Sequence, residues 1–102
     1  MGDLEHFIRQ EDILCLQTSS KAHQIEIITI HGVYQQYTTL QDIKSQLDSH
    51  FFQCHKSCII NLAHIQEIDK KNKTVTLTTD RVCQISTRLV NTLCIIVGVP
   101  GL

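Results

Sequence analysis

Apolar and polar residues alternate along most of this chain of 102 residues, in short runs that predict a mainly β protein. The clearest run is residues 23–30, where polar and apolar residues alternate and Ile25, Ile27 and Thr29 share one face. His31 and Gly32 follow as a connection of hairpin length, which leads into a strand at residues 33–38. The other segments that we expect to form strands are residues 4–9, 12–18, 64–69, 74–79 and 82–85, of which the last three form a meander.

Helical spacing is clearest in one segment. Thr39 followed by Asp42 has the form of a capping box, and apolar residues then recur on one face, so we expect a short amphipathic helix at residues 40–49. The end of the chain is ambiguous, because residues 89–97 suit both a helical face and a strand. The pattern there favours a short helical turn at the start of the segment.

A polar cluster interrupts the apolar stretch at residues 51–62, FFQCHKSCIINL. The aromatic pair before the cluster and the apolar run after it can anchor the segment in a core. His55, Lys56 and Ser57 are hydrogen-bond donors that such an anchor holds towards solvent. The stretch therefore predicts a surface loop with a functional role, in which these three polar side chains face solvent.

The composition is that of one small globular domain covering residues 1–102, with 42% hydrophobic and 19% charged residues. The longest apolar run is far shorter than the roughly 20 residues that span a bilayer, so we expect no membrane segment. The five cysteines are odd in number and have no framework spacing, which favours reduced thiols and a cytoplasmic location. A net charge of -1 argues against a globally basic nucleic-acid binder but allows local basic patches.

Metal binding is the first chemistry to consider, because His50, Cys54 and Cys58 offer imidazole and thiol ligands close together in the sequence. The set lacks a second, distant pair of ligands, and free cysteines are usually core residues. A metal- or redox-responsive interaction domain that uses these three residues is the alternative function. We find no phosphate loop, no paired carboxylates and no oriented Cys–His pair, so we expect neither an enzyme nor a cofactor.

Three polar stretches share one set of donors. They are SSKAH at residues 19–23, HKS at residues 55–57 and STR at residues 86–88. Each combines hydroxyl groups with a cation or an imidazole, a set that binds phosphate oxygens and leaves a longer side chain for a base edge. Solvated turns have a similar composition, so the donor set alone leaves both interpretations open.

Three longer segments carry a resemblance to a known family. They are EDILCLQTSSKAH, TTLQDIKSQLDSHFFQCHKSCIINLAHIQEID and CQISTR. The most specific part is FFQCHKSCIIN, and the order of strand, short helix, HKS loop and S-x-R ending adds to the likeness. Over roughly residues 7–93, the chain resembles the LytTR family of bacterial DNA-binding domains, above all the output domains of regulators in peptide quorum sensing. The resemblance implies an elongated stack of small antiparallel sheets with one short amphipathic helix, which contacts DNA through loops.

The resemblance also implies roles for individual residues. His23, Lys56 and Arg88 match the family's base-reading positions in successive major grooves. The residues that match phosphate-binding positions are Ser19, Ser20, Lys21, His55, Ser57 and Ser86. The chemistry agrees, because Arg can bind guanine with two hydrogen bonds while Lys and His donate to purine acceptors.

Partners follow from the same resemblance. We expect double-stranded DNA, with direct repeats in a promoter as the target, and a receiver domain that lies outside this chain. The domain is expected to be a monomer off DNA and to pair on DNA. Gln53 and Cys58 depart from the Arg and the aromatic residue that are common in the family, which predicts weaker nonspecific affinity. A clamp on about five to eight phosphates still makes binding strongly salt-dependent.

Cys54 and Cys83 each lie within three residues of a proposed DNA-contacting loop. If the segment that ends at Cys54 lies beside the strand that holds Cys83, a disulfide between them would disturb the DNA surface under oxidation. The alternative is that both thiols are buried and inert. Thiol labelling of the folded domain distinguishes the two.

Overall fold

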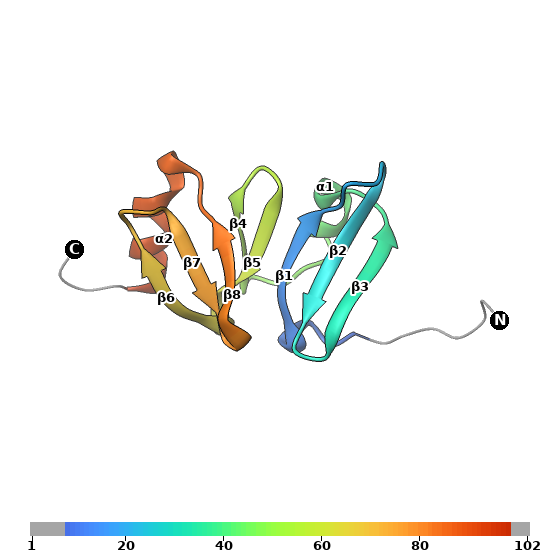
Figure 1. The fold of residues 1–102 in the computed structure, drawn as a ribbon, viewed down its shortest axis with the longest axis horizontal. Helices are drawn as coiled ribbons and strands as arrows, with labels where there is room; N and C mark the ends of the chain where they lie inside the picture. The colour runs from blue at the N-terminus through green and yellow to red at the C-terminus, as the bar shows by residue number, and fades with distance from the viewer. Residues whose placement is uncertain (1–7, 99–102) are drawn as a thin grey trace.

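The computed structural model describes residues 8–98, which form two antiparallel sheets and two helices (Figure 1). The strands are β1 Ile13–Thr18, β2 Gln24–Thr29, β3 Gly32–Tyr37, β4 Phe51–His55, β5 Cys58–Asn61, β6 Ile65–Asp69, β7 Thr74–Leu77 and β8 Arg81–Gln84. The helices are α1 Leu40–Lys44 and α2 Val90–Val97, and the 3-10 turns are η1 Gln10–Asp12, η2 Leu62–His64, η3 Thr78–Asp80 and η4 Thr87–Leu89. This architecture confirms the predicted mainly β fold with small antiparallel sheets.

The larger sheet is centred on β1. Its strand order is β3-β2-β1-β5-β4, whereas β6, β7 and β8 form the smaller sheet as a meander in chain order. β1 pairs with β2 on one side and with β5 on the other, so Leu16 lies between Ile27 and Ile59. The two sheets lie side by side along the long axis of the molecule (Figure 1).

The β2–β3 hairpin differs by one residue from the connection that the sequence predicts. Thr29 pairs with Gly32, so the two connecting residues are Ile30 and His31. The Thr29 hydroxyl donates to the Gly32 carbonyl at 2.9 Å and accepts from the His31 and Gly32 amides. Gly32 has a φ of 150°, which favours glycine at the first position of β3.

The helix α1 is shorter than expected and ends at Lys44 rather than Ser49. Its predicted start is confirmed, because the Thr39 hydroxyl accepts from the Asp42 amide at 3.1 Å. At the other end, the Ser45 hydroxyl donates to the Asp42 carbonyl at 2.8 Å and competes with continuation of the helix.

The ambiguous C-terminal segment forms the helix α2, which ends at Gly98 in a left-handed conformation. The strand expected at residues 4–9 lies mostly outside the described residues. Its last two members, Ile8 and Arg9, precede η1 and belong to neither sheet. Neither helix in residues 8–98 is long and apolar enough to cross a membrane.

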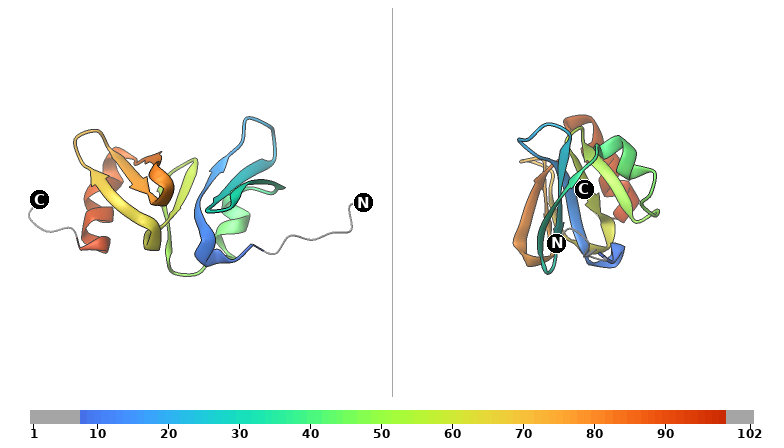
Figure 2. Two further views of the ribbon diagram at one scale, coloured as in Figure 1. Left: turned by 60° about the horizontal axis from the view of Figure 1, so that its bottom comes forward. Right: turned by 90° about the vertical axis from the view of Figure 1, so that its right-hand side faces the viewer.

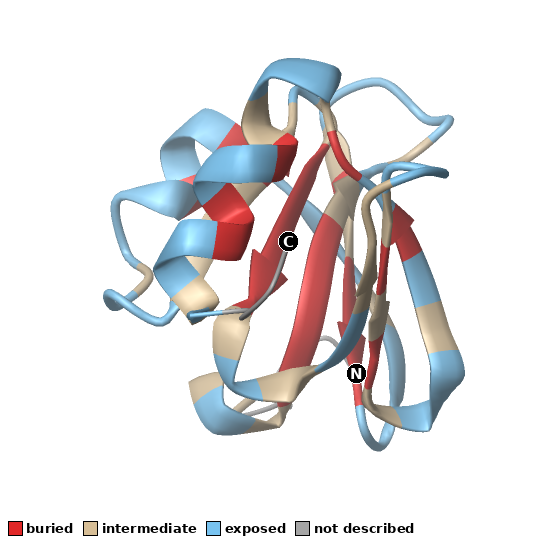
Figure 3. Cartoon of the chain, turned by 90° about the vertical axis from the view of Figure 1, so that its left-hand side faces the viewer, coloured by how far each residue is buried: buried red, intermediate tan, exposed pale blue. Residues whose placement is uncertain are grey.

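Two apolar clusters fill the interior. The smaller one joins the β1–β2 region of the larger sheet to Leu40 and Ile43 of α1. The larger one joins β1, β4 and β5 to the smaller sheet and to Leu93 of α2. Both helices lie on the same side of the strands (Figure 2), and α2 turns its buried residues towards them (Figure 3). The strands are thus held firmly, and their polar connections lie at the surface.

Candidate nucleic-acid interface

The three polar stretches singled out in the sequence lie along one edge of the molecule, which we call the loop edge (Figure 1). The first loop, residues 19–23, joins β1 to β2; the second, residues 55–57, joins β4 to β5; the third, residues 86–88, follows β8. They follow one another along the long axis, because β1 pairs with β5 and the end of β8 lies next to β4. The structure therefore brings together three segments that are far apart in sequence.

The first loop is a tight, internally bonded turn. The Ser19 amide donates to the Gln24 carbonyl at 3.1 Å, and the Ser19 hydroxyl accepts from the Lys21 amide at 3.1 Å. His23 has a φ of 60°, an uncommon backbone conformation for a residue other than glycine. These bonds fix the backbone from which the exposed side chains of Lys21 and His23 extend.

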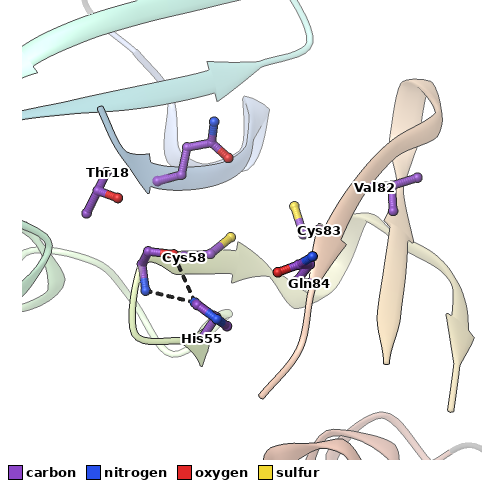
Figure 4. Close-up of a pocket in the computed structure, with 8 residues that line it drawn as sticks. Thr18, His55, Cys58, Val82, Cys83 and Gln84 are labelled. Carbon is purple, nitrogen blue, oxygen red and sulfur yellow. Dashed lines mark hydrogen bonds between the residues drawn. The ribbon is translucent and has the colours of Figure 1, made fainter. Parts of the chain in front are cut away.

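The second loop is a hairpin turn that is tied to the first. The Thr18 amide donates to the Ser57 carbonyl at 3.1 Å. Within the turn, the Ser57 amide donates to Nδ1 of His55 at 3.2 Å, and the Ser57 hydroxyl lies 2.9 Å from the same nitrogen (Figure 4). Because Nδ1 accepts the amide hydrogen, a neutral His55 carries its proton on Nε2, where it can be donated to a ligand.

The third loop is fixed to two other segments. The Ser86 amide donates to the Cys54 carbonyl at 2.8 Å, and the Ile85 amide donates to the Lys73 carbonyl at 2.8 Å. The Leu89 amide then bonds to the Ser86 carbonyl and closes the turn η4, which carries Arg88. These bonds place the third loop next to the second and next to the β6–β7 turn.

The three residues expected to read bases are all exposed: His23, Lys56 and Arg88. Within residues 8–98, their side chains make no hydrogen bond or ion pair with the rest of the protein. Of the six expected phosphate ligands, Ser20 and Lys21 are exposed, whereas Ser19, His55, Ser57 and Ser86 are partly buried. The geometry is thus compatible with the roles that the resemblance implies, which stay predictions.

Hollows separate the loops, and their linings carry no acidic residue. One hollow of about 320 Å³ lies between β1, the second loop and β8, and one of about 380 Å³ lies between the second and third loops. A third lies beside the first loop and is lined by Lys21 and His23. Among the described residues, no Asp or Glu lines any of these three hollows. The loop edge is therefore locally suited to an anion, although the whole chain has a net charge of -1.

The β6–β7 turn adds a feature that sequence reasoning missed. Lys73 lines the same hollow as His55 and Ser86, and its carbonyl holds the third loop. The turn is stabilised by Asp69, which accepts from the amide and the side chain of Asn72 at 2.9 and 2.7 Å. These bonds from Asn72 lower the pKa of Asp69. The run Lys70-Lys71-Asn72-Lys73 was the available signal, but only the meander's packing shows which loop it adjoins.

The ligand set of the alternative function is not brought together. His50 lies near the start of β4, at the opposite edge, where its Nδ1 is 3.2 Å from an Asp48 carboxylate oxygen. Cys54 lies at the other end of that strand and Cys58 on the next strand. Four residues of extended chain span about 13 Å, so His50 cannot share a metal ion with the two thiols. A centre made of His50, Cys54 and Cys58 is therefore wrong for this fold.

A different set of thiols does converge. The sulfur atoms of Cys15, Cys58 and Cys83 all lie within 4.8 Å of one another, and all three residues are buried. Figure 4 shows Cys58 and Cys83 directed into the space between the sheets. Hydrogen bonds from the thiols of Cys15 and Cys58, with a smaller effect of Arg81, lower the pKa of Cys83.

Cys54 lies beside the strand that holds Cys83, as the redox hypothesis requires. Its thiol donates to the Gln84 carbonyl at 3.3 Å. Both Cys54 and Cys83 are free thiols and are buried, with exposed fractions of 0% and 6%. Their burial agrees with the inert alternative, and the reactivity of the pair stays a prediction.

Comparison with known proteins adds a family match. The family model described as the LytTr DNA-binding domain matches residues 5–96. Accessory gene regulator protein A of Staphylococcus aureus (strain N315) is 30% identical over 87 residues, which are 85% of this chain and 36% of that protein. The protein of the same name from Staphylococcus epidermidis is also 30% identical over 87 residues. The chain thus spans about a third of the length of these relatives.

A solved structure supports the fold independently. The LytTr DNA-binding domain of a protein described as a methyl-accepting/DNA response regulator from Bacillus cereus superposes with a TM-score of 0.75, at 18% sequence identity. The superposition covers 89% of this chain and 85% of that one. At this level of identity the likeness concerns the arrangement of strands and helices.

Proposed function

We propose, from the premise that this chain belongs to the LytTR family of DNA-binding domains, that its loop edge binds duplex DNA with sequence specificity. The observation that carries the proposal is the alignment of three hydrogen-bonded loops, each of which carries one exposed and uncommitted side chain: His23, Lys56 or Arg88. Free donors on fixed backbone are what base recognition needs, because no internal contact must break before the ligand binds.

In this proposal, His23, Lys56 and Arg88 read base edges in the major groove. One such residue stands on each loop, and each extends into solvent. Arg88 can hold guanine with two hydrogen bonds to O6 and N7, whereas Lys56 and His23 donate to single purine acceptors. Arg88 is therefore the strongest discriminator of the three.

Phosphate contacts come from Ser19, Ser20, Lys21, His55, Ser57 and Ser86. The tautomer of His55 supports its role, because Nε2–H remains free while Nδ1 is held by Ser57. Lys73 joins this group, since it lines the hollow between the second and third loops. These contacts set the position of the protein on DNA and make its affinity depend on salt.

We infer further that the domain serves a bacterial transcription regulator. Two relatives are named as accessory gene regulators, and the similar Bacillus cereus domain comes from a protein described as a DNA response regulator. A receiver domain that controls pairing on promoter direct repeats fits this setting, as does a monomer off DNA. Such a domain acts in the cytoplasm and needs no catalytic activity.

Selection of bound sequences from a pool of random duplexes tests the proposal. We expect enrichment of a short motif, recovered as a direct repeat when two copies pair. The variant with His23, Lys56 and Arg88 all changed to Ala should lose the enrichment. The matched control is His50→Ala, which removes an exposed imidazole at the opposite edge and should select the same motif as the unchanged protein. Failure of the unchanged protein to enrich any motif would falsify sequence-specific binding.

A further inference from the structure

Three buried thiols meet at the junction of the two sheets. Cys15 lies on β1, Cys58 on β5 and Cys83 on β8, with exposed fractions of 0%, 6% and 6%. The strand pairing fixes two of them as diagonal neighbours, because Cys15 pairs with Ile60 and Cys58 pairs with Gln17. Cys83 reaches them from the smaller sheet, so the cluster exists only in the folded domain.

The distances suit one ion shared by all three sulfurs. Zinc binds thiolate sulfur at about 2.3 Å, which sets the sulfurs of a tetrahedral site about 3.8 Å apart. The sulfurs of Cys15, Cys58 and Cys83 lie within 4.8 Å of one another, so closure requires a movement of at most about 1 Å. A disulfide would join only two of these sulfurs and leave the third unused.

We propose that Cys15, Cys58 and Cys83 form a zinc-binding site whose occupancy weakens DNA binding. The second part of this proposal rests on the proposed function of the loop edge. All three ligands bind as thiolates, and the protons that their thiol groups carried are released to solvent, so the occupied site carries a net charge of -1. The hollow lined by Cys58 and Cys83 lets water reach the fourth position of the ion.

Each ligand lies on a strand that leads into or out of one loop. Cys15 precedes the first loop by four residues, Cys58 directly follows the second loop, and Cys83 precedes the third loop by three residues. Contraction of the sulfurs therefore moves the three loops relative to one another, away from the spacing of the metal-free domain. The added negative charge also repels phosphates, and together these effects lower DNA affinity about threefold or more.

Cobalt titration of the reduced protein tests the site without reference to DNA. Co²⁺ replaces zinc and gives an intense thiolate-to-metal charge-transfer absorption. We expect this absorption at one equivalent of metal, its displacement by zinc, and at least a tenfold lower affinity for Cys83→Ala. The matched control is Cys94→Ala, which removes another buried thiol with the same exposed fraction of 6% and should bind cobalt normally. Circular dichroism and thermal melting establish that both variants are folded.

Absence of thiolate absorption in the folded, reduced protein overturns the zinc site, and so does an unchanged cobalt affinity in folded Cys83→Ala. DNA binding is then measured with and without one equivalent of zinc, and Cys83→Ala should lose the response. An unchanged affinity in the zinc-loaded protein overturns the regulatory part. If the metal-free protein does not bind DNA, the proposed function is wrong, while the cobalt spectrum still decides the site.

Discussion

The two edges of the molecule carry similar polar residues but use them differently. At the edge opposite the loops, His64 lies 2.6 Å from the Glu11 carbonyl through Nε2 and 3.0 Å from the Thr78 hydroxyl through Nδ1. At the loop edge, the side chains of His23 and Lys56 have no such partner within residues 8–98. His64 thus stabilises the fold at one edge, whereas the side chains of His23 and Lys56 are left available at the other.

Charge separates the edges in the same way. Glu11 and Asp48 line a hollow at the opposite edge, and Asp12 lies 3.4 Å from the His31 imidazole. The hollows of the loop edge have no acidic lining among the described residues. Residue type is therefore a poor guide to function in this fold, and the presence or absence of an internal partner is a better one.

Replacing Asn61 with Ala should give the largest effect and should appear only in stability. Asn61 is 2% exposed; its side chain donates to the Ile13 carbonyl at 2.9 Å and accepts from the Ala63 amide at 2.9 Å. Leaving these two groups unpaired costs about 2–3 kcal/mol in the free energy of unfolding, measured in urea. DNA affinity of the folded variant should be unchanged. A large loss of affinity without a loss of stability would contradict the division between the edges.

Replacing Arg88 with Ala should have the opposite effect: DNA binding should weaken while the stability of the fold is unchanged. Loss of a bidentate contact to guanine costs about 1–3 kcal/mol of discrimination, while the exposed side chain contributes little to folding. We expect lower affinity and relaxed preference at one base pair, measured by competition between duplexes that differ at that position. Equal losses on specific and random duplexes would show that Arg88 binds only the backbone.

Replacing Lys21 or Lys73 with Ala should give the smallest effect. Each variant should bind all duplexes somewhat more weakly and lower the slope of log affinity against log salt by about one. The control is Arg9→Ala, which removes the same charge at the opposite edge, where Arg9 lies 3.9 Å from a Glu11 carboxylate oxygen. An equal change in slope for Arg9→Ala would mean that net charge, rather than position, drives binding.

The local structure follows from the sequence to a large extent. The cap formed by Thr39, the meander of the smaller sheet and the HKS turn all depend on neighbours a few residues away. Such short-range features are encoded by turn residues and by the period of the hydrophobic pattern. The helix α1 is shorter than its pattern because Ser45 bonds back to Asp42, a competition that periodicity does not reveal.

Long-range placement does not follow in the same way. The convergence of Cys15, Cys58 and Cys83 depends on the pairing of β1 with β5 and on the contact between sheets. Likewise, Lys73 joins the loop edge only because β7 pairs with β8, which places the β6–β7 turn next to the third loop. Periodicity assigns a residue to a face of a strand but does not identify the strand that lies opposite, so the thiol cluster was not predicted.

The pairing of β1 with β5 also has a kinetic consequence. Cys15 lies opposite Ile60, so this contact closes a loop of some forty-five residues, whereas β2, β3 and the meander pair with near neighbours in sequence. During synthesis, β1 would expose one backbone edge until β5 leaves the ribosome. Formation of this non-local ladder should therefore limit the folding rate, and mutations in it should change the rate of folding more than mutations in the meander.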